Sequence, residues 1–314
     1  MGFWTEKRVL VTGGRGFLGS FVVERVQRTD CATVVYPSRA EWDLRDRSQV
    51  QACFADVRPE IVIHLAGVVG GIAANIRYPA RFFYDNAAMA LHVTDCAHQC
   101  GVEKFVAVGP MCAYPKHTSM PLREEEFWNG YPEETNAAYA HAKRMLLAHI
   151  QACRQQYQFP GIYLLLANLY GPRDDFDPKH SHVIPALIRR FDQAARACAS
   201  RVTVWGSGRP SREFLYVEDA ADAVLGAAER YDDSMPLNIG SGEEVTIRQI
   251  AEWIARLTGF EGEIDWDQSQ PDGQMRRVCS CPRASALLGF RPQVPLREGL
   301  ARTVAWYVAN VSVA

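Results

Sequence analysis

The chain has 314 residues, of which 48% are hydrophobic and 22% are charged, so it can bury a large core as one large domain or two lobes. Its formal net charge of −2 excludes a general attraction to nucleic acid or anionic membrane. No apolar run approaches the ~20 residues of a membrane span, so we expect a cytoplasmic protein with no nucleic-acid or membrane partner.

The nine cysteines are scattered, odd in number and without CxxC spacing, which favours reduced thiols and no metal site. Cys96 and Cys100 are four residues apart on an expected helix. Cys279 and Cys281 would point the same way from an expected strand. In a reducing compartment we assign neither pair to a disulfide or a metal.

The first expected strand, residues 8–11, runs into a turn with G-x-x-G-x-x-G spacing, and an amphipathic helix follows. The first glycine permits a tight turn, the second lets a diphosphate approach the backbone, and the third allows close helix packing. The turn therefore predicts a dinucleotide site formed by Gly13, Arg15, Gly16, Phe17, Leu18 and Gly19.

Three further segments, 32–38, 58–67 and 104–110, have the composition of buried parallel strands separated by helical stretches. This alternation predicts an α/β fold with a doubly wound parallel sheet. The last residues of the segment 58–67, Leu65, Ala66 and Gly67, are expected to line the cofactor site.

The end of the second strand indicates which dinucleotide is used. An NAD-preferring protein usually places a carboxylate there for the ribose 2′-hydroxyl, whereas this chain has Ser38 and Arg39. Arg15 adds a second guanidinium, so the pair favours a 2′-phosphate and hence NADP, with Asp43 as a further cofactor contact. The alternative is that both arginines are solvated surface residues.

Tyr139 and Lys143 are four residues apart and lie on one face of an expected helix. A nearby ammonium is expected to lower the phenol pKa from its usual ~10. Together with the glycine turn, Asn86 and the Arg212–Asp219 segment, this pair resembles the extended short-chain dehydrogenase/reductase superfamily. The resemblance implies a Rossmann domain (1–170 and 212–237) and a smaller α/β substrate lobe (171–211 and 238–314).

Longer stretches, at 69–75, 168–191, 204–215 and 238–247, resemble the GDP-L-fucose synthases, which act on GDP-4-keto-6-deoxymannose. The resemblance implies proton and hydride transfer at C4 by Tyr139 and Lys143, with Cys112 and His182 as the acid/base pair that inverts C3 and C5. A thiol and an imidazole suit this chemistry because their usual pKa values, ~8.5 and ~6.5, lie near neutrality. A capping or core role for His182 is the alternative.

One position departs from the superfamily pattern. A serine or threonine normally stands four residues before the tyrosine of the loop that follows the fourth strand, and here that residue is Pro110, before Tyr114. Proline offers no donor. Three explanations remain open: slower reduction supported by Tyr139 alone, a substitute hydroxyl or water, or a protein that mainly epimerises.

The resemblance also implies a GDP-sugar pocket. Its expected residues are Asn168, His182, Arg190, Trp205, Arg212 and Arg277; a solvated Arg190 and a core Trp205 are the alternatives. The family more often has lysine where Arg277 falls. A homodimer is implied as well, through helices such as 85–100 and 139–153.

These features predict an NADP-dependent GDP-sugar 3,5-epimerase and 4-ketoreductase. A related GDP-sugar, such as a colitose or heptose precursor, and epimerisation with a weakened redox step are the alternatives within the same class. A non-catalytic NADP-binding sensor is the alternative from another class, and it has no need of Tyr139, Lys143, Cys112 and His182 together.

Overall fold

The computed structural model describes residues 2–178, 181–269, 272 and 274–312. Its main sheet has six strands in the order β2-β1-β3-β4-β5-β9, and all neighbouring strands are parallel. The strands are β1 (Arg8–Thr12), β2 (Thr33–Val35), β3 (Ile61–His64), β4 (Lys104–Pro110), β5 (Gly161–Leu166) and β9 (Leu237–Ile239). The predicted parallel sheet is confirmed.

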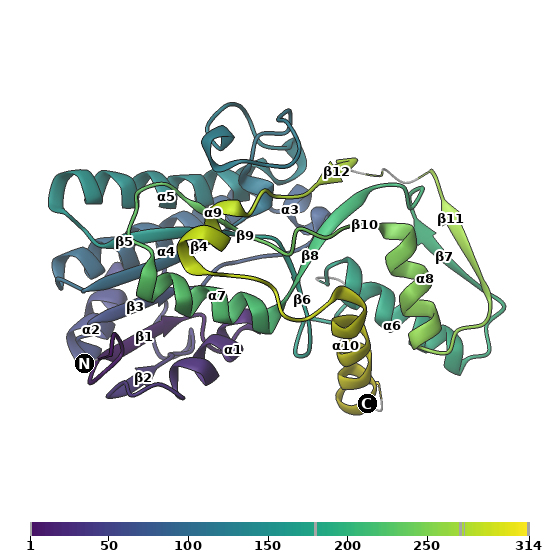
Figure 1. Cartoon of the computed structure of the whole chain (residues 1–314), viewed down its shortest axis with the longest axis horizontal. Coiled ribbons are helices and arrows are strands. Elements are labelled where there is room, and N and C mark those ends of the chain that lie inside the picture. Colours follow the sequence, from purple (N-terminus) through teal and green to yellow (C-terminus); the bar gives the residue numbers. More distant parts are fainter. Residues whose placement is uncertain (1, 179–180, 270–271, 273, 313–314) are drawn as a thin grey trace.

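Helices cover both faces of this sheet (Figure 1). One face packs against α1 (Phe17–Val26), α7 (Val217–Arg230) and α9 (Pro282–Leu288). The other packs against α2 (Arg47–Val57), α4 (Pro79–Gln99) and α5 (Ala137–Tyr157), with the short α3 (Ile72–Arg77) leading into α4. Two apolar clusters, one on each face, form the core of this larger part.

Two of the expected strands are shorter than their apolar segments. β2 ends before Pro37, which has no N–H for a ladder, and β3 ends at His64, so that Leu65, Ala66 and Gly67 form a loop. β4 spans 104–110 as expected and ends at Pro110. The long connection from β4 to α5 holds three short 3₁₀ turns, η1 (Met111–Ala113), η2 (Glu124–Glu126) and η3 (Glu134–Asn136).

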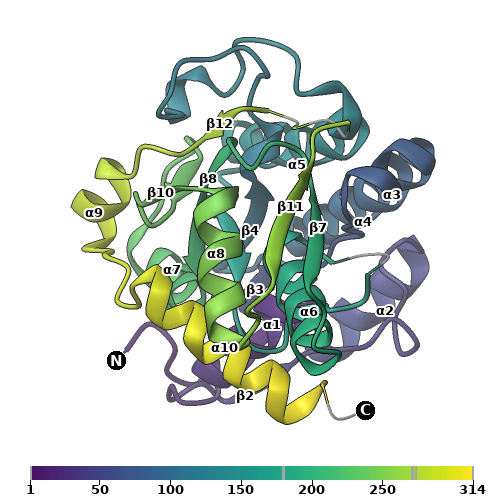
Figure 2. The ribbon, with the colours of Figure 1, turned by 90° about the vertical axis from the view of Figure 1, so that its right-hand side faces the viewer.

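The smaller lobe has its own core, between α6 (Val183–Arg196), α8 (Ile247–Leu257) and α10 (Leu296–Asn310), as Figure 2 shows. Its mixed sheet joins β6 (Asn168–Tyr170), β8 (Ser211–Tyr216), β10 (Glu244–Thr246) and β12 (Arg276–Arg277). A separate parallel pair is β7 (Arg201–Trp205) with β11 (Glu263–Asp267). Thr246 and Gln249 close a capping box at the start of α8.

The chain passes between the two parts at β8. Residues 212–216, expected with the first domain, pair in the smaller sheet, whereas α7, directly after them, packs on the main sheet. The last strand of the main sheet, β9, extends to Ile239. The exact division into two domains stays a prediction. Within the described ranges, no helix has both the length and the apolar character that crossing a membrane requires.

Candidate active site

The glycine turn between β1 and α1 is shaped by close backbone packing. Gly13 has φ +74°, and a Cβ there would lie 2.7 Å from the backbone nitrogen of Ala66. A Cβ at Gly19 would collide with the carbonyl oxygen of Gly13. Gly16 begins α1 without a side-chain cap, so the first N–H groups of the helix stay open. These features fit the diphosphate of a dinucleotide.

The two arginines near the end of β2 are exposed and already have carboxylate neighbours. Arg15 Nη2 lies 3.0 Å from Glu41 Oε2, and Arg39 Nε lies 3.4 Å from Asp43 Oδ2. Asp43 is held more firmly by Arg45, whose side-chain hydrogen bonds lower the pKa of that carboxyl. Arg15 and Arg39 therefore reach a ligand only in competition with Glu41 and Asp43.

The loop after β3 lies beside Lys143. A Cβ at Gly67 would lie 3.2 Å from Asn86 Oδ1 and 3.4 Å from Lys143 Nζ. Asn86 holds the loop by accepting a hydrogen bond from Val68 N (3.0 Å) and donating one to Val68 O (2.9 Å). The fold thus brings the predicted cofactor loop, Asn86 and Lys143 together.

Tyr139 and Lys143 both project from the first turns of α5. Burial lowers the pKa of Lys143 to about 8. Burial also raises the pKa of Tyr139 above its usual value, and the nearby Cys112 adds to the shift. The expected lowering of the Tyr139 pKa is therefore wrong, because the loss of hydration around the phenolate is the largest cause of the shift. The phenol keeps its proton at neutral pH.

Cys112 lies in η1, directly after β4, and is partly exposed. Burial raises the pKa of its thiol, while the positive charges of Arg277 and Lys143 act in the opposite direction. The thiol also acts electrostatically on Tyr139. Cys112, Tyr139, Lys143 and Arg277 therefore share one electrostatic neighbourhood, although they come from distant parts of the sequence.

His182 is the N-cap residue of α6 and is solvent-accessible, so the alternative of a core histidine is wrong. Neighbouring protein atoms reduce the hydration of its imidazolium and lower its pKa, and Asp175 opposes that shift. The carbonyl oxygen of Ser181 lies 3.8 Å from the Cβ position of Gly71. Among the described residues, no hydrogen bond joins His182 to Cys112.

Arg212 and Arg277 are neighbours in the smaller sheet, paired in the register of β8 and β12. Burial and the charge of Arg277 lower the pKa of Arg212 to about 10. Their hydrogen bonds go to neutral groups: Arg212 to Ser211 O, and Arg277 to Gln274 Oε1. Within the described residues neither guanidinium has a carboxylate within 4.0 Å, so the positive charge of this pair has no counter-ion there.

The remaining expected substrate residues lie in the same lobe. Asn168 on β6 donates to Glu213 O at 3.0 Å, and Arg190 on α6 donates to Thr203 O at 2.7 Å. Trp205, at the end of β7, is 66% exposed, so the alternative of a core tryptophan is wrong. An exposed indole is available for stacking on a ligand.

Sequence reasoning missed two carboxylates at the candidate site. Asp175 acts electrostatically on His182, and Glu133 acts on Cys112. Both lie outside helices and strands, where no periodic pattern marks them.

A separate surface cavity of about 420 Å³, lined by residues that include Gln151, Arg154 and Asp232, contains none of the candidate residues.

The parallel sheet, the glycine turn and the Tyr139–Lys143 pair define an enzyme of the extended short-chain dehydrogenase/reductase class, with a Rossmann domain that binds NAD(P). Residues 9–240 match the NAD dependent epimerase/dehydratase family. The chain belongs to that family and, within it, to the GDP-L-fucose synthases.

Three relatives support this placement. The chain is 43% identical over 305 residues to probable GDP-L-fucose synthase 1 of Oryza sativa subsp. japonica. The match covers 97% of this chain and 93% of the relative. A GDP-L-fucose synthetase from Naegleria fowleri bound to NADP superposes with a TM-score of 0.91 at 29% identity, covering 100% and 98% of the two chains. A GDP-6-OMe-4-keto-L-xylo-heptose reductase from C. jejuni superposes with a TM-score of 0.92 at 27% identity, covering 98% and 99%.

Proposed function

We propose that this chain is an NADP-dependent 3,5-epimerase and 4-ketoreductase of a GDP-4-keto-6-deoxy-hexose. The observation that carries the proposal is the pair Arg212 and Arg277, two guanidiniums with no counter-ion among the described residues, of which Arg277 acts electrostatically on Cys112. Such a pair suits the diphosphate of a nucleotide sugar and places the sugar near acid/base groups. The names of the relatives, which act on GDP-sugars, support the same substrate class.

The residues present fit an NADP molecule. The turn at Gly13 and the open start of α1 would hold its diphosphate. Arg15 and Arg39 would bind its 2′-phosphate, and Leu65–Gly67 would contact the cofactor beside the diphosphate. Bound there, the reduced cofactor supplies the hydride for C4 of the sugar. The relative bound to NADP supports this choice over NAD.

Reduction at C4 also needs a proton for the developing alkoxide. Tyr139 is suited to donate it, since its raised pKa keeps the phenol protonated at neutral pH. Lys143, with a pKa of about 8, holds an ammonium beside Gly67 and the cofactor loop. Its proposed role is to orient the cofactor next to Tyr139.

Inversion at C3 and C5 needs one group to remove a proton and another to return one on the opposite face. The C4 ketone acidifies both positions. In the structure the raised pKa of Cys112 keeps its thiol protonated, while the lowered pKa of His182 keeps its imidazole neutral. One partner thus holds a proton and the other has room for one, as an acid/base pair requires.

Solvent exchange tests the epimerase part of the proposal. In D₂O, wild type should incorporate deuterium at C3 and C5 of GDP-4-keto-6-deoxymannose, and Cys112→Ser and His182→Asn should suppress this while still binding NADPH. Cys100→Ser, at an exposed thiol at the end of α4, is the control. Unchanged exchange in Cys112→Ser would assign that thiol to packing.

Pro110 favours a second candidate, an epimerase with a weakened redox step. β4 ends at Pro110, and the next residue is the buried Met111, so neither supplies the hydroxyl that relatives place here. One missing preorganised donor costs about 10²–10³ in rate. Pro110→Ser should then accelerate hydride transfer in a single turnover. A fast wild-type step that the variant does not improve would show that another group fills the role.

The particular nucleotide sugar and the oligomeric state are also proposals. The C. jejuni reductase makes a GDP-heptose the main competing substrate, and a competition experiment with both keto sugars shows which one the chain prefers.

A homodimer through α4 and α5 is supported by exposed Phe83, Tyr84 and Leu91 on α4. Light scattering of wild type and Leu91→Arg tests it, and a monomeric wild type would exclude it.

A further inference from the structure

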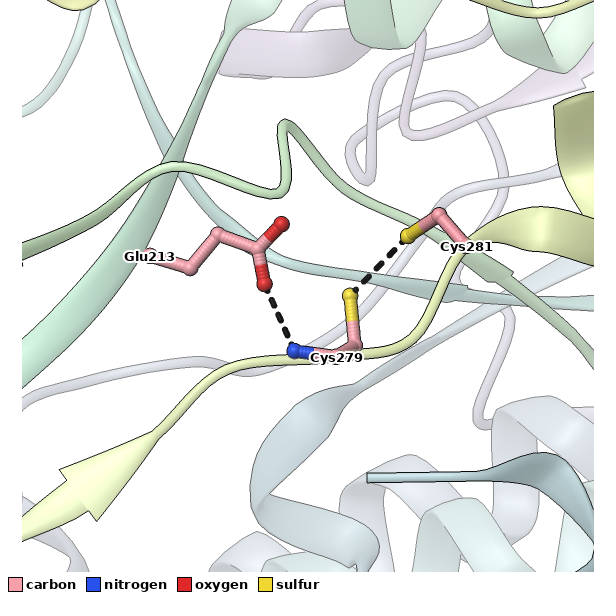
Figure 3. Close-up of side chains that lie close together, drawn as sticks. All are labelled: Glu213, Cys279 and Cys281. Atoms are coloured by element: carbon pink, nitrogen blue, oxygen red, sulfur yellow. Dashed lines mark hydrogen bonds between the residues drawn. The ribbon is translucent and has the colours of Figure 1, made fainter. Parts of the chain in front are cut away.

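Two cysteines and a glutamate converge at the edge of the smaller sheet. Cys279 and Cys281 follow β12, and Glu213 projects toward them from β8 (Figure 3). The two Sγ atoms lie 3.3 Å apart, and one ligand atom from each of the three residues lies within 4.8 Å of the others. We call these three residues the thiol–carboxylate cluster.

Hydrogen bonds hold the backbone of this cluster in place. Cys279 N donates to Glu213 Oε2 at 2.7 Å, and Gly242 N donates to Glu213 Oε1 at 2.7 Å. On the other side, Ser280 N donates to Leu122 O at 2.9 Å and Asn238 Nδ2 donates to Ser280 O at 3.2 Å. The three ligands therefore come from two chain segments that are already fixed against each other, as a binding site for an ion requires.

The carboxylate of Glu213 is hydrogen-bonded to two backbone N–H groups but has no cationic partner among the described residues. Glu213 is only 2% exposed. Cys279 is 3% exposed, and its Sγ lies 3.3 Å from that of Cys281. A cation at this place would offset the carboxylate and allow the thiols to ionise.

In contrast to the expectation from the cysteine spacing, we propose that Cys279, Cys281 and Glu213 bind one thiophilic divalent cation of the Zn²⁺ type, with water in the remaining position. Two thiolates and one carboxylate form a ligand set that favours zinc over magnesium or calcium. With bonds of about 2.3 Å to sulfur at a tetrahedral angle, the two sulfurs have to separate to about 3.8 Å. Cys281 is partly exposed and can supply that movement.

Binding of the cation needs no oxidant or reductant. The cation forms two metal–sulfur bonds and one metal–oxygen bond, and the two thiol protons pass to solvent. A Cys279–Cys281 disulfide is the competing outcome, and it would need an oxidant and an approach of the sulfurs to about 2.05 Å. The buried carboxylate beside the thiols favours the metal, because a neutral disulfide leaves the charge of Glu213 uncompensated.

The cluster is separate from the residues that we assign to the reaction, although it adjoins two of them. Glu213 directly follows Arg212, and Cys279 lies two residues after Arg277. An ion bound here would tie β8 to the segment after β12, the two strands that carry the arginine pair. The inference does not depend on the identity of the sugar or on catalysis.

A titration of reduced, metal-free chain with Cd²⁺ under argon tests the proposal, with ultraviolet Cd–thiolate absorption and proton release as readouts. We expect one ion and two protons per chain, and displacement of Cd²⁺ by Zn²⁺. Cys279→Ser and Cys281→Ser should remove the signal. Glu213→Gln should weaken binding by at least about 10- to 100-fold. That is the loss typical of residues that only hydrogen-bond to a metal ligand, and Glu213 is proposed to be a ligand itself. Cys100→Ser and Cys198→Ser, at exposed thiols, should bind like wild type.

Two results would overturn the proposal. One is an equal Cd²⁺ signal in the Cys279→Ser/Cys281→Ser double variant, which would place the ion elsewhere. The other is the absence of a saturable signal in wild type, including the case where thiol counting after air exposure finds two of the nine cysteines joined as a disulfide. Cys281→Ser changes a partly exposed side chain, so it gives a folded comparison even where Glu213→Gln disturbs the sheet.

Discussion

Two pairs of arginines serve the two proposed nucleotide sites, and their surroundings differ. Arg15 and Arg39 are exposed and have carboxylate neighbours, Glu41 and Asp43. Arg212 and Arg277 lie side by side in a sheet, with neutral hydrogen-bond partners and a mutual repulsion that helps to lower the pKa of Arg212. In the part of the chain that the structure describes, the second pair has no counter-ion, whereas the first pair has two.

This difference indicates how much each pair contributes to binding. Water and salt screen exposed charges, and an ion pair with a neighbouring carboxylate has to be exchanged before a phosphate is bound. A half-buried guanidinium whose hydrogen-bond partners are neutral has already lost part of its hydration when the fold forms. We therefore expect the GDP-sugar site to depend more strongly on its arginines than the 2′-phosphate site does.

The largest expected effect is at Arg277. Replacing it with Met removes a charge-assisted contact to the diphosphate and should weaken GDP binding by about 10- to 150-fold, or about 1.5–3 kcal/mol. Arg277→Lys keeps the charge and should lose less than about tenfold. Calorimetric titration with GDP measures both. Equal losses in the two variants would show that shape, and not charge, determines the contact.

A further cation, Lys143, should make NADPH binding depend on pH. Its folded pKa of about 8 lies below the usual 10.5, so the ammonium is present below pH 8 and is lost as the pH rises through 8. NADPH affinity should fall above pH 8, by at most about tenfold per pH unit. Lys143→Met should remove this dependence, as measured by NADPH fluorescence. A wild-type affinity that is constant to about pH 9.5 would contradict the role of the ammonium.

A smaller effect is expected at the exposed pair. Arg39→Ala should weaken NADPH binding by about fivefold, near 1 kcal/mol, because its side chain is exposed and has Asp43 as a partner. NADH binding should not change, and it is the internal control. If both cofactors lose affinity equally, Arg39 does not recognise the 2′-phosphate.

Salt should weaken ligand binding at the two arginine pairs to different extents. Raising the ionic strength from about 0.05 to about 0.5 M shortens the Debye length several-fold and should reduce the preference for NADPH over NADH. GDP binding at Arg212 and Arg277 should fall less. The measurement compares the NADPH/NADH affinity ratio with the GDP affinity at each salt concentration. A steeper loss of GDP affinity would mean that Arg212 and Arg277 are the more strongly screened pair.

The smallest effect concerns the fold without ligand. Arg212 has a lowered pKa, so its charge destabilises the fold at all pH values below about 10. Removing the neighbouring charge in Arg277→Met should stabilise the unliganded chain by about 0.2–1 kcal/mol, as for like charges opposite each other in a sheet. Urea unfolding at neutral pH measures this. A destabilised Arg277→Met would mean that packing of the arginine stem outweighs the repulsion.

The main sheet was predictable from local signals. The apolar segment 104–110 matches β4 because Pro110 ends the ladder, and the glycine turn follows β1 as its spacing requires. The pairing of β8 in the smaller sheet was not predictable, because its partners β6, β10 and β12 are short and distant in sequence. No local pattern specifies such contacts.

The candidate site was predictable in its residues and less so in its electrostatics. Tyr139 and Lys143 follow from helical spacing, yet the direction of the Tyr139 pKa depends on burial, which the sequence does not contain. The contact between Arg212 and Arg277, and that between Glu213 and the two cysteines, arise from strand register and from one loop. Resemblance placed Arg212 and Arg277 in one pocket but gave no hint of their repulsion.

The most direct test of the account is a single reaction in D₂O. The chain is incubated with GDP-4-keto-6-deoxymannose and NADPH, and the NADPH absorbance and the product NMR spectrum are followed together. We predict one NADPH oxidised per sugar converted, with deuterium at C3 and C5 and a hydride from the cofactor at C4. If a preparation that binds both GDP and NADPH shows no NADPH oxidation and no deuterium incorporation, the proposed epimerase and reductase is contradicted.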